Sequence, residues 1–270
     1  MSMTDYRHIP LRHDFAFSEV MREPDICQCF LETVLGIRIR KLEFISKQED
    51  LTDSLLGHGI RLDIYVEDDA GSVYNIEMQN RLETMKRIRY YQGGIDRRTL
   101  GRSRNYEDLK TSFIIVVCSY DPAGLHYPLY ARESRLACPV GTAEYDDGSH
   151  VVLLNGRYDP EYRPEMPAVC EFLDLLNQTG DLSPQTLQYP LAQMAAESLA
   201  RLRKNEEKEA VFMTLSELIE REAKDRYEEG RAEGLAEGHE EGRHEEREAN
   251  IKKLMTSLNL SREEVEKLLK

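Results

Sequence analysis

The sequence of 270 residues has no apolar run long enough to cross a membrane. Its longest apolar run, residues 113–118 (FIIVVC), is far shorter than the roughly 20 apolar residues that a membrane-spanning helix needs. The N-terminal stretch MSMTDYRHIPLRHDF also lacks the apolar core of a secretory signal peptide. We therefore expect a cytoplasmic protein with no membrane association.

Cysteine and histidine lack the spacing of a structural metal site. The five cysteines are odd in number, and Cys27 and Cys29 have one residue between them, unlike the two-to-four spacing of most zinc knuckles. The histidines form no HxxxH or HExxH pattern, and the pair Gly93 and Gly94 lacks the spacing of a phosphate-binding loop. The spacing of the cysteines and histidines argues against a structural zinc site and favours buried or free thiols in a reducing cytosol. The glycine pair gives no sign of a phosphate-binding loop.

Positive charge is scarce, because 36 Lys and Arg face 50 Asp and Glu for a net charge of −14. The whole molecule repels polyanions, so a nucleic-acid role requires a local basic patch and a divalent cation. Residues 81–104 supply such a patch, with eight basic against two acidic residues, a net charge of +6. This segment is predicted as a helix over residues 82–104. It either holds phosphates or is a solvated helix whose arginines pair with acidic neighbours.

Up to about residue 160, the hydrophobic pattern predicts helices that alternate with strands. A helix interrupted at Pro24 is predicted over residues 15–35, with Gly36 as its C-cap. Two alternating runs around the acidic loop 67–72 predict a β-hairpin. The order predicts an α/β layer arrangement with a mixed sheet. The predicted strands are 40–46, 60–66, 73–79, 111–119 and 151–154.

Beyond the prolines of residues 157–167 the pattern is helical, over 168–177, 187–203 and 208–229. From residue 230, glycine recurs at every fourth position to residue 242, in a segment otherwise almost entirely charged or Ala. Each glycine costs roughly 1 kcal/mol in a helix, so we favour a flexible spacer over a glycine-faced helix docked on a partner. Ser261 is expected to begin a short last helix, with Glu264 completing a capping box.

The predicted hairpin places two acidic side chains opposite each other. If residues 68–72 form the loop, Asp63 faces Glu77, with their Cβ atoms about 5 Å apart. Like charges in that arrangement are destabilising. A Mg²⁺ ion bound by both carboxylates and a backbone carbonyl would offset the repulsion and could activate a water at a phosphodiester. The alternative is an ordinary solvated hairpin face whose charges have no role.

Residues 61–66 (RLDIYV) and 74–79 (YNIEMQ) resemble the D…ExQ core of the PD-(D/E)xK nuclease superfamily. They are similar in particular to the Rpn group of recombination-promoting nucleases, also described as transposases. The opening DFAF (14–17), the YYQ of 90–92 and the repeated Glu-Gly-Arg tail agree, so the resemblance covers about residues 10–250. Ser18 departs from the group, which commonly has Lys there, and this puts a DNA contact by that side chain in doubt.

The resemblance implies a restriction-endonuclease-like fold, in which a mixed β-sheet core is flanked by helices and followed by a helical C-terminal extension. It also implies that Asp63, Glu77 and Gln79 are catalytic. Asp63 and Glu77 would bind Mg²⁺ (or Mn²⁺ or Ca²⁺), with Asp14 or Glu19 as a further acidic ligand. Gln79 stands where the superfamily has lysine, so it can hydrogen-bond a water but carries no charge.

The leading hypothesis is a divalent-metal-dependent endodeoxyribonuclease, linked by the resemblance to recombination, mobile elements or phage defence. The alternative is a catalytically inactive DNA- or protein-binding module on the same fold. We expect a nuclease-like domain over 1–160, a helical region over 161–229 that packs on the core or a second subunit, and a low-complexity tail with short helices over 230–270. The helical half packs either in cis or against a second copy of the chain, in which case it forms a homodimer. The predicted DNA-binding residues are Lys86, Arg87, Tyr91, Arg97 and Arg98.

Overall fold

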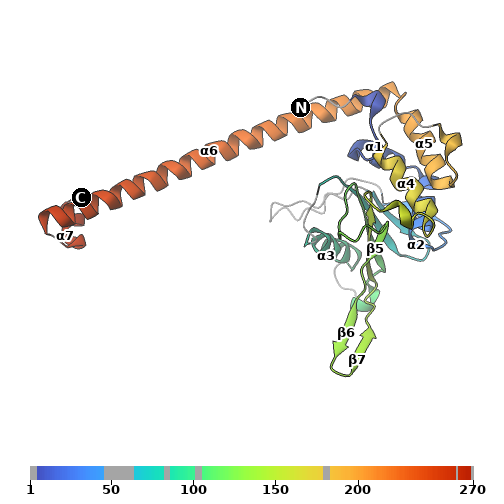
Figure 1. The fold of residues 1–270 in the computed structure, drawn as a ribbon, viewed down its shortest axis with the longest axis horizontal. Helices are drawn as coiled ribbons and strands as arrows, with labels where there is room; N and C mark the ends of the chain where they lie inside the picture. Colours follow the sequence, from blue (N-terminus) through green and yellow to red (C-terminus); the bar gives the residue numbers. More distant parts are fainter. Residues whose placement is uncertain are drawn as a thin grey trace. The chain divides into compact units, whose positions relative to one another are not determined.

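The computed structural model describes residues 5–45, 64–81, 86–100, 105–178, 183–259 and 261–268 (Figure 1). It divides into two compact units, Met1–Glu209 and Ala210–Lys270. The three-part division expected from the sequence stays a prediction. Within the described ranges, no helix is long and apolar enough to cross a membrane.

The predicted α/β class is confirmed by a six-stranded mixed sheet with the strand order β1-β2-β3-β4-β8-β5. Strands β3, β4 and β8 run parallel, and the other neighbours pair antiparallel. The strands β1, β2 and β3 lie close to the predicted ones, and so do β4 and β8. The bounds are β1 (Leu42–Phe44), β2 (Ile64–Asp68), β3 (Val73–Gln79), β4 (Ser112–Cys118), β5 (Leu129–Ala131) and β8 (Ser149–Asn155).

The hairpin of β2 and β3 has the predicted register. Tyr65 pairs with Asn75 and Glu67 with Val73. Asp68 fixes the turn, because its Oδ1 accepts hydrogen bonds from the backbone amides of Ala70 and Ser72, at 2.9 and 2.8 Å. Gly71 takes a φ of +86°, a left-handed conformation that glycine adopts without strain. Residues 60–63 of the predicted strand, Asp63 among them, lie outside the described residues.

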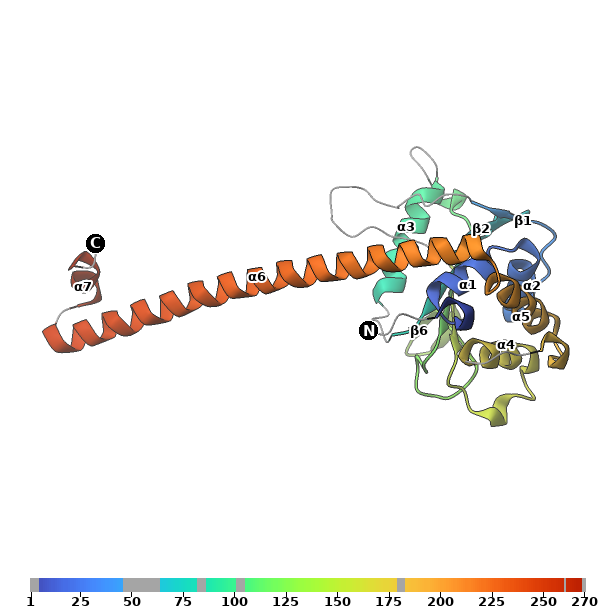
Figure 2. The same cartoon turned by 90° about the horizontal axis from the view of Figure 1, so that it is seen from above.

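Helices flank both faces of the sheet (Figures 1 and 2). On one side lies α3 (Lys86–Leu100), the basic helix, whose predicted ends fall outside the described residues. On the other side lie α1 (Asp14–Met21), α2 (Pro24–Leu35), α4 (Pro167–Asn177) and α5 (Pro190–Leu202). Short 3-10 turns occupy Tyr6–His8, Tyr106–Asp108, Pro160–Tyr162 and Pro184–Thr186.

The single interrupted helix predicted over residues 15–35 is two helices, α1 and α2. Pro24 occupies the first turn of α2, where its missing N–H costs no hydrogen bond. Gly36 ends α2 with a φ of +67°, as the sequence predicted. The proline therefore separates two helices at this point.

The sequence did not predict β5 or the two-stranded ribbon of β6 (Arg135–Cys138) and β7 (Gly141–Glu144). All residues of the ribbon are exposed, and it projects from the core in Figure 1. An exposed ribbon need not alternate apolar and polar residues, so it carries no signal of the kind that identified the other strands.

The second unit contains most of α6 (Glu206–Leu258) together with α7 (Arg262–Leu268). Helix α6 continues through the glycine segment, so the preference for a flexible spacer is wrong. The residues between the glycines are mostly Ala, Glu, Arg and Leu, which are strong helix formers and offset the cost of each glycine. Ser261 and Glu264 form the predicted capping box, because the Glu264 carboxylate accepts from the Ser261 amide at 2.9 Å and the Ser261 hydroxyl accepts from the Glu264 amide at 3.4 Å.

Candidate active site

Strand β3 turns Asn75, Glu77 and Gln79 toward the face of the sheet that α3 covers. On that face lies an apolar cluster that includes Tyr65 of β2 and Tyr91 of α3. Asn75 is 0% exposed and Glu77 is 4% exposed. The alternative of a solvated hairpin face is therefore wrong, because the connection between the parallel strands β3 and β4 passes over this face as a helix.

The Glu77 carboxylate lies in the interior of the sheet, where its Cα partner on β4 is Val116. The Asn75 side-chain amide donates a hydrogen bond to Glu77 Oε1 at 2.9 Å. Transfer of an ionised carboxylate from water into the interior is costly unless charge and hydrogen bonds compensate for it. Such a buried acid is a common feature of functional sites.

Gln79 ends β3 beside the end of β4. Tyr120, two residues beyond β4, donates its hydroxyl to Gln79 Oε1 at 2.9 Å. The backbone amide of Ser119 donates to the Gln79 carbonyl at 3.0 Å. The carboxyl ends of neighbouring parallel strands are a common location for ligand sites in α/β proteins. The position of Tyr120 directly after a buried strand was the signal that could have identified it.

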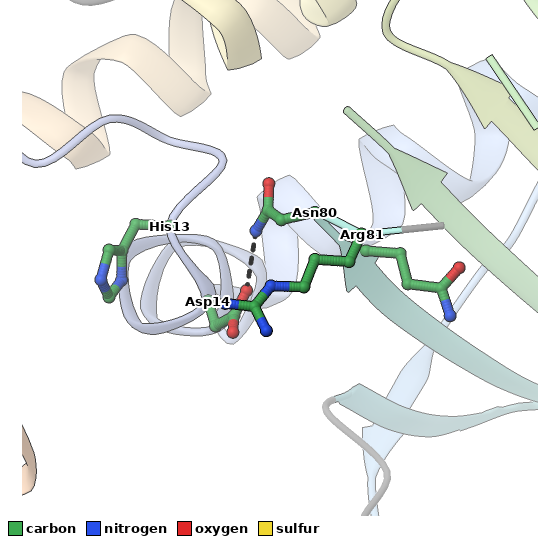
Figure 3. Close-up of a pocket in the computed structure, with 5 residues that line it drawn as sticks. His13, Asp14, Asn80 and Arg81 are labelled. Carbon is green, nitrogen blue, oxygen red and sulfur yellow. Dashed lines mark hydrogen bonds between the residues drawn. The ribbon is translucent and has the colours of Figure 1, made fainter. Parts of the chain in front are cut away.

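A pocket of about 410 Å³ lies at the end of β3, lined by His13, Asp14, Gln79, Asn80 and Arg81 (Figure 3). Asp14 is the first residue of α1. The Asn80 side-chain amide donates to Asp14 Oδ1 at 3.0 Å and to the Arg12 carbonyl at 2.8 Å. These hydrogen bonds tie the end of β3 to the start of α1. The structure thereby brings together two of the predicted site residues, Asp14 and Gln79.

His13 and Arg81 also line this pocket, and they differ in burial. His13 caps α1, because its Nδ1 accepts a hydrogen bond from the Phe15 amide at 3.2 Å. Burial lowers the pKa of His13, and the Asp14 carboxylate offsets part of that change. The lower pKa favours the neutral form of the imidazole. Arg81 is exposed, and its side chain extends toward Asp14 in Figure 3.

The side chains present suit a hard divalent cation. The predicted ligands Asp14 and Glu77 offer carboxylate oxygens, which Mg²⁺ and Ca²⁺ prefer, and the third, Asp63, lies outside the described residues. Over the residues that the structure describes, His, Cys, Asp and Glu form no group of three or more that could hold a metal. Carboxylate oxygens suit such a cation, but Glu77 is not among the residues that line the pocket with Asp14 and Gln79.

The basic residues of α3 differ in exposure. Lys86, Arg87 and Arg97 are exposed, and Arg98 is half-buried with its guanidinium 5.2 Å from the centre of the Tyr65 ring. Arg87 donates through Nε to the Tyr91 hydroxyl and lies 5.1 Å from the centre of that ring. Tyr91 itself is 5% exposed and belongs to the core. The DNA contact of Tyr91 stays a prediction. Because the ring is buried, Tyr91 would contribute by positioning Arg87 and not by stacking on a base.

The thiols have the predicted character. All five cysteines lie in the described residues and none forms a disulfide. Cys118 is buried beneath α3, and burial raises the pKa of its thiol to about 11. It packs in the core, as the sequence predicted.

The mixed six-stranded sheet, flanked by helices and carrying a buried glutamate and a glutamine on one central strand, defines a restriction-endonuclease-like α/β fold with a helical C-terminal part. Residues 11–129 match the family described as PD-(D/E)XK nuclease family transposase. This match confirms the resemblance to the PD-(D/E)xK nucleases over residues 11–129, a range that includes Asp14, Glu77, Gln79 and α3, whereas the repeated Glu-Gly-Arg tail lies outside it. Neither a curated protein nor a solved structure matches the chain.

Proposed function

We propose that this protein is a divalent-metal-dependent endodeoxyribonuclease that hydrolyses phosphodiester bonds. The observation that carries the proposal is the burial of Glu77, 4% exposed, on the central strand β3. A buried carboxylate is weak evidence for stability, because desolvation of the charge opposes folding. The matched family is one of nucleases, and the resemblance of the motif around Glu77 implies a chemical use for an acidic side chain there.

We assign the metal ligands to Asp63 and Glu77, with Asp14 as a further acidic ligand. The Asp63–Glu77 pairing is supported by the register of β2 and β3, since the pairs Ile64–Ile76 and Tyr65–Asn75 are those that the pairing requires. A bound Mg²⁺, Mn²⁺ or Ca²⁺ would lower the pKa of a water molecule and offset the charge that develops on the phosphate.

Gln79 is assigned to the orientation of the attacking water. Its Oε1 accepts from Tyr120, so the Nε2 amide hydrogens are the groups that Gln79 can direct toward a water or phosphate oxygen. A neutral amide supplies direction without charge. The charge that a lysine would contribute at this position must therefore come from elsewhere in the site.

The DNA strand is assigned to the surface of α3, where Lys86, Arg87, Arg97 and Arg98 would hold phosphates. These side chains lie on the helix that covers the Glu77 face of the sheet. Phosphate contacts of this kind position the backbone and carry no sequence information directly. Binding should accordingly weaken steeply as the salt concentration rises.

The proposal is tested by nicking of supercoiled plasmid with Mg²⁺, Mn²⁺, Ca²⁺ or EDTA. Nicking should require Mg²⁺ or Mn²⁺, and Glu77→Gln and Asp63→Asn should each lower its rate by about 100-fold or more. Glu43→Gln is the matched control, because it changes an exposed acid of β1. Equal nicking in EDTA, or unchanged nicking by Glu77→Gln, would show that the proposal is wrong.

An inactive DNA-binding module is the second candidate, favoured by the exposed basic side chains of α3. It would bind DNA without cleavage, and neither Mg²⁺ nor Mn²⁺ would raise its melting temperature. A folded protein that behaves in this way would support the inactive DNA-binding module and contradict the proposed enzyme.

We also propose a cytoplasmic protein that forms a homodimer through its helical C-terminal half and acts in recombination, mobile-element movement or phage defence. The dimer is supported by the apolar side chains that α6 exposes, Val211, Leu215 and Leu218. The biological setting rests on the family resemblance. The mass in solution of the full chain, by light scattering, tests the dimer.

A further inference from the structure

We infer that Asn75 is a positioning residue that holds the Glu77 carboxylate in the orientation in which it binds the metal. The role in metal binding rests on the proposed function. The contact between the two side chains is independent of it.

Asn75 lies in apolar surroundings. It is 0% exposed, and its Cα partners are Tyr65 on β2 and Ile114 on β4. Its Oδ1 is buried and has no hydrogen-bond partner in the described parts of the chain. A buried acceptor without a partner lowers stability. An apolar side chain of similar volume would avoid that loss, so stability does not account for an amide at this position.

The hydrogen bond to Glu77 accounts for the presence of an amide side chain at position 75. An ionised carboxylate only accepts hydrogen bonds, so the amide must turn Nδ2 toward Glu77 and Oδ1 away. The bond is 2.9 Å long and buried, and a donor that meets a charged acceptor makes one of the stronger hydrogen bonds in proteins. It restricts rotation of the carboxylate about its last carbon–carbon bond. Hydrogen bonds of this kind orient metal ligands, and their loss typically lowers metal affinity 10- to 100-fold.

Gln92 of α3 provides a matched control. Like Asn75, it has a buried amide oxygen, here Oε1, without a hydrogen-bond partner in the described residues. Its Nε2, however, donates to Asp96 and to Ser112, at 2.7 and 2.8 Å. Ser112 pairs with Val73, at the opposite end of β3 from Gln79. Loss of the Gln92 amide therefore changes the interior beneath α3 but removes no hydrogen bond to Glu77.

The test compares the full-length wild type with Asn75→Asp, Asn75→Leu and Gln92→Leu. Mn²⁺ affinity is measured from the electron paramagnetic resonance signal of the unbound ion. Infrared spectra with ¹³C-labelled glutamate, assigned by subtraction of Glu77→Gln, report the carboxylate stretch of Glu77 without any metal. Two Asn75 variants are used because Asn75→Asp keeps the side-chain shape and Asn75→Leu introduces no charge. Thermal melts establish that each protein is folded.

In both Asn75 variants we expect Mn²⁺ affinity to fall by about 10-fold or more and the Glu77 stretch to shift. Gln92→Leu should retain wild-type affinity and the wild-type stretch. Wild-type affinity in a folded Asn75 variant, or an equal loss in Gln92→Leu, would overturn the inference. If the wild type binds no Mn²⁺, the proposed metal site fails, and the infrared spectra alone decide whether Asn75 holds Glu77. An unshifted stretch then overturns that contact.

Discussion

At the scale of single residues, the hydroxyl of Tyr120 and the amide of Gln79 link the ends of two strands. Tyr120→Phe removes this hydrogen bond and leaves the ring in place. We expect plasmid nicking to slow by about 10-fold, because Gln79 then loses its preferred orientation, while stability falls by only about 0.5–1.5 kcal/mol. Plasmid nicking and urea unfolding measure the two effects.

Tyr106→Phe is the control for that variant, since it removes the hydroxyl of a tyrosine that is 83% exposed. Nicking by Tyr120→Phe at the rate of Tyr106→Phe would show that the hydroxyl does not orient Gln79.

A second prediction concerns Asp96, the half-buried acid of α3. Burial raises the pKa of Asp96, and the hydrogen bond from Gln92 offsets part of that change. The folded state therefore binds the proton more tightly than the unfolded state, and stability from this group is lost as pH rises through its folded pKa. Asp96→Asn keeps an acceptor for Gln92 and has no charge to bury. It should be more stable than the wild type at pH 7, with the advantage shrinking toward pH 4.

Urea unfolding at the two pH values measures this difference. Asp108→Asn is a matched control, because Asp108 is an exposed acid outside α3. An advantage of Asp96→Asn that is the same at pH 4 and pH 7 would contradict the prediction.

The sequence predicted Glu77 because the expected register of the hairpin placed it opposite Asp63, and it predicted Gln79 through the resemblance of residues 74–79 to the D…ExQ core. It did not predict Tyr120, Asn80 or the role of Asn75. Tyr120 meets Gln79 only through the register between β3 and β4, and Asn80 meets Asp14 only through the packing of α1. Contacts between distant segments leave no periodic signal. The burial of Glu77 was also absent from the local pattern, because it results from a helix that follows β3 in the chain.

At the scale of elements, local patterns predicted most strands and helices of the first unit. They failed for the short edge strand β5, for the exposed ribbon of β6 and β7, and for the continuous helix α6. The ribbon of β6 and β7 is exposed on both faces and shows no alternation. In α6 the glycines alone favour a flexible spacer, but the residues between them are strong helix formers and their combined preference outweighs the cost of the glycines. A pattern of propensities is more informative when it is summed over a long window.

The glycines of α6 give the third prediction. Gly234 and Gly238 have nothing within 4 Å of an added Cβ. Replacement of both by Ala should stabilise the helix by about 0.5–1 kcal/mol each, since glycine loses the most backbone freedom on helix formation. Circular dichroism during thermal unfolding of the second unit measures the gain.

The same double variant tests whether the glycine face contacts another copy of the chain. Gly36→Ala is the contrasting change, because its φ of +67° should make the Ala destabilising. If the double variant unfolds at a lower temperature and its mass in solution falls, the glycine face forms a close interface with another copy. The predicted gain in helix stability is then contradicted.

At the scale of the whole molecule, the chain consists of two units that differ in kind. The first, Met1–Glu209, contains the sheet, its flanking helices and the candidate site. We expect a protein of residues 1–209 to fold with one cooperative transition and to retain the metal and DNA binding of the full chain. Calorimetry and Mn²⁺ titration of the truncated protein test this expectation.

Loss of the second unit should convert the proposed dimer to a monomer, seen by light scattering. A truncated protein that fails to fold would show that the second unit supports the first. A truncated protein that remains a dimer would show that the interface lies outside α6 and α7.

Strand β3 hydrogen-bonds to β2 on one side and, along all seven of its residues, to β4 on the other. Its amides should be among the last of the first unit to exchange with deuterium. Glu77 and Gln79 belong to this strand, so we expect their backbone to move little when DNA binds. For a nuclease of the proposed kind, the DNA backbone must then bend to reach them. Cleavage would favour steps that kink or unstack easily, and this preference would arise without a contact to any base.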